Sequence, residues 1–140
     1  MPQPILPAGE AREALLADHS RLRRLLVELE DLADRVANDT EVVSQFHSVA
    51  KQFRRALETH NQAEENVLQP LLRACDSWAP SRAEQMMLEH VAEHGSILAA
   101  FDSSETVELS SAVPRMAEDL REHMAKEEGS FLSVEVLREP

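Results

Sequence analysis

A histidine and a glutamate near the middle of the chain have the types and the spacing of metal ligands. His60 and Glu64 stand four residues apart within the stretch 59–65. On an α-helix, residues four apart differ by about 40° in direction and about 6 Å in height, so both side chains can reach one site. Burying them without partners would cost several kcal/mol, on the order of the total stability of a small domain. The pair therefore predicts a compensating partner such as a metal ion.

Five more residues of the same kinds occupy comparable positions in otherwise apolar patterns. In chain order they are His19, His90, His94, His123 and Glu127. Taken alone, each histidine is compatible with a buried side chain that has an ordinary hydrogen-bond partner. His47 differs, because it lies about 100° away from the apolar face of its helix, and we interpret it as a flanking or surface residue.

Helices must position these residues. The chain has three glycines and no tyrosine, and it is rich in alanine, leucine, glutamate and arginine, which are strong helix formers. Apolar residues recur at alternating spacings of four and three, as in helices packed in a bundle. The predicted faces consist of Leu15, His19, Leu22, Leu26, Leu29, Ala33 and Val36; Phe46, Ala50, Phe53, Leu57, His60, Glu64, Val67 and Leu71; Ala83, Met87, His90, His94, Ile97 and Phe101; and Val113, Met116, Leu120, His123 and Glu127. We predict an all-α fold, an up-down-up-down antiparallel four-helix bundle.

Capping residues and prolines predict the ends of these helices. Residues 1–9 contain three prolines and indicate an irregular arm, which leaves one bundle domain over residues 10–140. The Asn-Asp-Thr sequence at 38–40 predicts the start of the second helix, and the Ser-x-x-Glu capping box at 81–84 that of the third. Ser110 or Ser111, followed by Pro114, predicts the start of the fourth.

The predicted bundle brings the polar residues to one level. In antiparallel neighbours, two residues lie at the same level when they are equally far from the connecting loop. From Thr40, His19 is 21 residues back and His60 is 20 residues forward, and the pairs on either side of the second loop agree in the same way. Five histidines and two carboxylates in one buried layer exceed the four ligands of a zinc site and favour two iron-type ions.

Together these motifs resemble the hemerythrin-like proteins, also called the HHE cation-binding domain. The likeness spans about residues 10–132. It rests on Asp18-His19-Ser20-Arg21-Leu22, on His60-x-x-x-Glu64-Glu65 followed by Leu68-Gln69-Pro70, on His90-x-x-x-His94, and on His123-x-x-x-Glu127-Glu128 with Phe131-Leu132. The resemblance implies a non-haem di-iron centre, bridged by two carboxylates and an oxo or hydroxo group, with one iron position open to dioxygen or a related small molecule.

The resemblance also implies a role for each matching residue. The terminal imidazoles are His19, His60, His90, His94 and His123, and the bridging carboxylates are Glu64 and one residue of the fourth helix. Some family members have that carboxylate five residues after the histidine, which would select Glu128. The apolar face selects Glu127 instead, since Glu128 lies about 140° around the helix from His123. We predict Glu127, with Glu65 on the surface.

The expected function is binding or sensing of dioxygen or a related small molecule by two iron ions. Apolar residues around the site would keep it dry: Leu22, Leu57, Met87, Ile97 and Met124. The main alternatives are a di-iron oxidoreductase acting on peroxide or nitric oxide in a stress response, and iron storage. A zinc-protease interpretation of the His-x-x-Glu-His sequence at 90–94 leaves His19, His60 and His123 unexplained.

Charge and cysteine content limit the partners and the setting. The formal net charge is −12, which argues against binding to nucleic acid or to an anionic membrane. No apolar run approaches the roughly 20 residues that span a bilayer. Cys75 is the only cysteine and the first residues lack the pattern of a secretory signal, so we expect a cytoplasmic protein.

Overall fold

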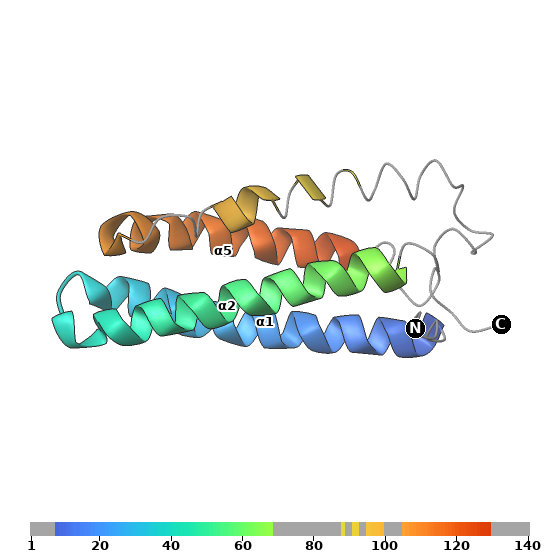
Figure 1. Cartoon of the computed structure of the whole chain (residues 1–140), viewed down its shortest axis with the longest axis horizontal. Coiled ribbons are helices and arrows are strands. Elements are labelled where there is room, and N and C mark those ends of the chain that lie inside the picture. Colours follow the sequence, from blue (N-terminus) through green and yellow to red (C-terminus); the bar gives the residue numbers. More distant parts are fainter. Residues whose placement is uncertain (1–7, 69–87, 89–90, 93–94, 100–104, 130–140) are drawn as a thin grey trace.

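Three long helices lie side by side in the computed structural model, which describes residues 8–68, 88, 91–92, 95–99 and 105–129 (Figure 1). They are α1 (Ala8–Val36), α2 (Val43–Ala63) and α5 (Thr106–Glu128). Two shorter helices, η1 (Thr40–Val42) and the π-helical η2 (Glu64–Leu68), precede and continue α2. All the regular elements in the described residues are helices, as the sequence predicts, and α1 runs opposite to both α2 and α5 (Figure 1).

The turn between α1 and α2 lies where the sequence predicts it. The Asp39 side chain accepts a hydrogen bond of 3.0 Å from the backbone N–H of Glu41, which caps η1. At its other end, α1 begins at Ala8, so residues 8 and 9 belong to the helix and not to the irregular arm. The predicted capping box of the third helix lies outside the described residues, as do the other seven residues of the arm.

The predicted start of the last helix is wrong. Helix α5 begins at Thr106, and Pro114 lies inside it. A proline removes one backbone hydrogen-bond donor, but its fixed φ angle is compatible with a helix. The buried face of α5 continues on both sides of Pro114, at Val113 and Met116. A hydrogen bond of 2.8 Å between His47 and Thr106 joins the beginnings of α2 and α5.

The apolar faces predicted for α1, α2 and α5 form one continuous core. Phe46, Phe53 and Leu57 of α2 are fully buried, and Leu26 and Leu29 of α1 pack against them. Of the predicted positions in these helices whose side chains are described, all are buried except Ala33, which is partly exposed. The polar residues predicted to interrupt these faces are buried as well, so the core contains a polar layer. None of the described helices is both long and apolar enough to cross a membrane.

Candidate metal centre

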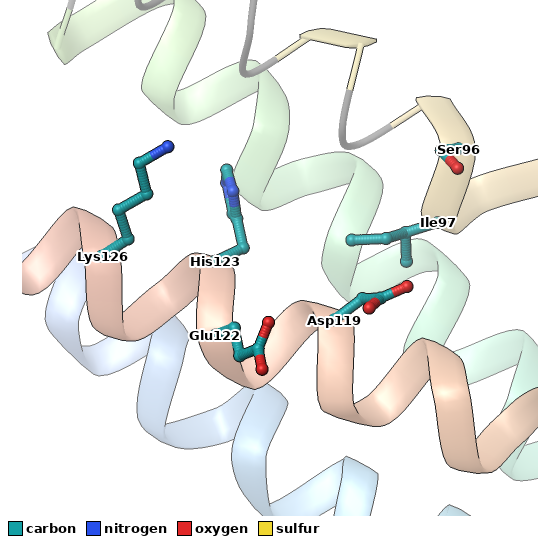
Figure 2. Close-up of a pocket in the computed structure, with 6 residues that line it drawn as sticks. All are labelled: Ser96, Ile97, Asp119, Glu122, His123 and Lys126. Atoms are coloured by element: carbon teal, nitrogen blue, oxygen red, sulfur yellow. The ribbon is translucent and has the colours of Figure 1, made fainter.

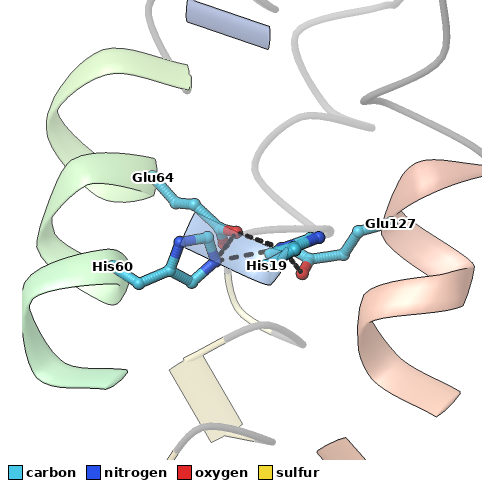
Figure 3. Close-up of side chains that lie close together, drawn as sticks. All are labelled: His19, His60, Glu64 and Glu127. Atoms are coloured by element: carbon cyan, nitrogen blue, oxygen red, sulfur yellow. Dashed lines mark hydrogen bonds and ion pairs between the residues drawn. The ribbon is translucent and has the colours of Figure 1, made fainter. Parts of the chain in front are cut away.

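Four of the predicted ligands meet in one buried cluster. His19 comes from α1, His60 from α2, Glu64 from the first residue of η2, and Glu127 from the last turn of α5. Each offers one nitrogen or oxygen atom, and these four atoms lie within 4.8 Å of one another. Figure 3 shows the side chains pointing toward one another from three directions. None is more than 2% exposed.

The Nε2 atom of His19 is the centre of the cluster. It lies 3.1 Å from Nε2 of His60, 3.3 Å from Oε1 of Glu127 and 3.6 Å from Oε1 of Glu64. Oε1 of Glu64 also contacts Nε2 of His60. Two imidazole nitrogens and two carboxylate oxygens therefore converge on one point, which is the donor chemistry of a site for iron or a similar ion.

A change of helix type coincides with one of these residues. Helix α2 ends at Ala63, and η2 continues it as a π-helix from Glu64. The backbone N–H of Glu64 points at the carbonyl oxygens of both His60 and Asn61. Single π-turns inserted in α-helices occur frequently at functional sites. The spacing of apolar residues does not predict this turn.

Two carboxylates outside the cluster hold the histidines in place. Oε2 of Glu128 lies 2.8 Å from Nδ1 of His19, and Oδ2 of Asp18 lies 3.3 Å from Nδ1 of His60. Both contacts make Nδ1 the protonated donor and leave Nε2 as the nitrogen that faces the cluster. Arg23 donates to both oxygens of Glu128, at 2.8 and 2.9 Å.

These contacts separate the roles of two neighbouring residues. Glu127 lies in the cluster, as its position on the apolar face predicts, whereas Glu128 lies outside the cluster and contacts the far side of the His19 ring. Glu65 is exposed, as predicted. The sequence motifs contain both Asp18 and Glu128, but they predict no role for Asp18 and present Glu128 only as an alternative ligand, because nothing in the sequence gives the partners of these residues.

His123 adjoins the cluster without being part of it. It is 8% exposed, and its Nε2 lies 3.3 Å from Oε1 of Glu127. His123 also lines a pocket of about 370 Å³, whose other described residues are Ser96, Ile97, Asp119, Glu122 and Lys126 (Figure 2). The remaining two predicted ligands, His90 and His94, lie outside the described residues.

The carboxylates make the two central histidines strong bases. Burial disfavours the imidazolium of His19, but hydrogen bonds to Glu127, Glu64 and Glu128 outweigh it and raise the pKa of His19 to about 10. The pKa of His60 is also raised, because Asp18 and Glu64 outweigh its burial. For Glu128, Arg23 and His19 outweigh burial and lower the pKa. In the metal-free state a proton therefore takes the position among the carboxylates that a metal cation could occupy.

The comparisons with known proteins agree with this chemistry. The family model of the hemerythrin HHE cation-binding domain matches residues 10–134, which include every residue of the cluster. No curated protein and no solved structure matches the chain. The match covers most of the chain, and a protein with this match and a buried cluster of histidines and glutamates belongs to the hemerythrin HHE cation-binding domain family.

Proposed function

We propose that this chain binds two iron ions in the polar layer of its core and uses them to bind or sense dioxygen or a related small molecule. The observation that carries the proposal is the convergence of His19, His60, Glu64 and Glu127 from separate helices within 4.8 Å. Burying two carboxylates is favourable only if positive charge accompanies them. Family membership supports a cation as the source of that charge.

The donor set fits iron ions. The proposed terminal ligands are His19, His60, His90, His94 and His123, and the proposed bridges are Glu64 and Glu127. Imidazole and carboxylate are donors that iron accepts, and the second oxygen of each carboxylate allows one glutamate to serve two ions. When bound, the two ions would supply an open position for dioxygen. The chain supplies the neutral imidazoles, with Asp18 and Glu128 retaining the protons on Nδ1.

The surroundings of the cluster favour binding over oxidation chemistry. Leu22, Leu57 and Met124 are each at most 1% exposed and exclude water from this part of the core. The sequence has no tyrosine that could donate a proton or an electron nearby. A pocket that excludes water and has few proton donors favours reversible binding of dioxygen, because cleavage of an O–O bond needs protons.

We further propose that the helical residues described at 88, 91–92 and 95–99 belong to one helix, which completes an up-down-up-down bundle. The opposite directions of α1 and its two neighbours support this arrangement (Figure 1). It would bring His90 and His94 to the level of the cluster and so complete the ligand set. The single Cys75, which cannot form an intramolecular disulfide, supports a reducing, cytoplasmic setting.

Metal content and visible spectra test the proposal. We expect two irons per chain and an absorption band that appears with oxygen and disappears when oxygen is removed. Glu64→Ala should lose stoichiometric binding of two metals, and the exposed Glu65→Ala is the matched control that should retain it. Rapid consumption of peroxide would instead favour the oxidoreductase. One tightly bound zinc with peptidase activity would contradict both functions.

A further inference from the structure

A second pocket, distinct from the one beside His123, lies between α1 and α2. Its volume is about 230 Å³. The described residues that line it are Asp18, Arg21, Leu22, Gln52, Arg55, Ala56 and Thr59. Its rim therefore carries two guanidinium groups, one from each helix, together with a carboxamide and a hydroxyl group.

No residue that the structure describes neutralises the charges of the two arginines in this pocket. Neither Arg21 nor Arg55 forms an ion pair or a hydrogen bond anywhere in the part of the chain that the structure describes. Other arginines of the same helices do pair with carboxylates: Arg23 with Glu128 and Arg54 with Glu58. In a protein with 26 acidic and 14 basic residues, two unpaired guanidinium groups lining one pocket leave it with positive charge that an external anion can neutralise.

The other polar groups of the pocket narrow the choice of anion. Guanidinium groups bind phosphate oxygens through paired hydrogen bonds, and Gln52 and Thr59 add further donors. Asp18, by contrast, is an acceptor, so the ligand needs a hydrogen to donate to it. A protonated phosphate carries both kinds of group, whereas sulfate has no proton to donate near neutral pH. We propose that this pocket binds a hydrogen phosphate group, either free or on a small phosphorylated molecule.

The position of Asp18 places this pocket next to the cluster. Asp18 lines the pocket, and its Oδ2 lies 3.3 Å from Nδ1 of His60. A phosphate that donates to Asp18 therefore contacts the residue that orients His60. The two arginines, by contrast, do not contact the cluster in the described structure, so we expect the pocket to bind phosphate whether or not the iron site is occupied.

Calorimetric titration of the full chain with inorganic phosphate, at constant ionic strength, tests the site. We expect saturable binding, with sulfate weaker than phosphate. Arg21→Gln and Arg55→Gln should each weaken phosphate binding by about tenfold or more, because each removes charge-assisted hydrogen bonds. Arg24→Gln is the matched control, since Arg24 is an exposed residue of α1 that lines neither pocket. Asp18→Asn should reduce the preference for phosphate over sulfate.

Several results would overturn the assignment. One is the absence of saturable phosphate binding, and another is a loss of phosphate affinity in Arg24→Gln equal to that in the two pocket variants. A third is loss of phosphate binding when a chelator removes all metal, because phosphate would then bind to the metal ions. Titration with glycerol phosphate distinguishes free phosphate from a phosphorylated small molecule as the ligand. If glycerol phosphate binds more tightly than inorganic phosphate, the ligand is a phosphorylated small molecule; if it binds more weakly, the ligand is free phosphate.

Discussion

At the scale of single residues, the histidines of the cluster depend on carboxylates that are not ligands. Glu128 of α5 reaches across to His19 of α1, and Asp18 of α1 reaches across to His60 of α2. Sequence periodicity predicts which residues are buried, because that depends on one helix at a time. It does not predict these contacts, because each depends on the relative position of two helices.

Glu128→Gln should weaken metal binding without removing it. The amide keeps an acceptor for Nδ1 of His19 but loses the charge that Arg23 and His19 share. Loss of such an outer partner lowers metal affinity by roughly 10- to 100-fold in other proteins. Competition with a chromophoric chelator measures the change. Glu65→Gln, on the exposed side of η2, should have no effect, and an equal affinity for both variants would contradict the orienting role.

The raised pKa of His19 makes the stability of the metal-free protein depend on pH. The pKa is about 10 in the folded state against an ordinary value of 6.5. Because the folded state binds this proton more tightly, the added stability is fully present below pH 6.5 and is lost as the pH rises through 10. The urea concentration at the midpoint of unfolding of the metal-free chain should therefore decrease as the pH is raised from 6.5 to 10.

His19→Gln provides the comparison for this pH dependence. The variant lacks the titrating group, so the fall in its midpoint over the same range should be smaller than in the unmodified chain. Identical slopes for the two proteins would show that the His19 proton does not contribute to stability.

At the scale of elements, the pattern of apolar residues is a better guide to helices than the residues that cap them. The buried faces of α1, α2 and α5 follow the predicted positions from Leu15 through Glu127, since burial repeats with the helical period. The predicted start of α5 is too late because Ser110 and Pro114 suit a first turn, whereas the helix contains both in its interior, where the proline removes a backbone hydrogen bond. The turn at Glu64 leaves no trace in the pattern.

An ion pair with two contacts, between Arg121 of α5 and Glu30 of α1, links these helices outside the cluster. Arg121 directs both terminal nitrogens at the two oxygens of Glu30, and each group shifts the pKa of the other in favour of the charged forms. Both side chains are about one-third exposed, so a double-mutant cycle with Glu30→Gln and Arg121→Gln should give a coupling of no more than about 1 kcal/mol.

The pair Asp31 and Arg35 serves as the control for this cycle. It lies within α1 and is more than half exposed, so its coupling should be smaller, about 0.3 to 0.5 kcal/mol. A coupling for Glu30 and Arg121 that does not exceed this value would mean that the double contact does not stabilise the packing of α5 on α1.

At the scale of the whole molecule, the candidate centre joins three helices that are remote in sequence. A ligand that binds only the folded state stabilises it in proportion to the logarithm of its concentration, by about 2.7 kcal/mol at 100 times the dissociation constant. Chelation of the metal should therefore lower the midpoint of thermal unfolding. Glu64→Ala should already have the lower midpoint and should not respond to the chelator. A chelator effect of equal size in that variant would contradict binding at the cluster.

The π-turn at Glu64 has a consequence for how this chain compares with its relatives. A π-turn holds one residue more than an α-turn, so η2 is equivalent to a single-residue insertion in an otherwise regular helix. Residues 65–68 are rotated relative to the positions that they would have in a continuous α-helix, so a helical wheel drawn from His60 does not place them correctly. Relatives that lack the π-turn should be one residue shorter at this point, and an alignment should place its gap next to the exposed Glu65 and keep His60 and Glu64 in register.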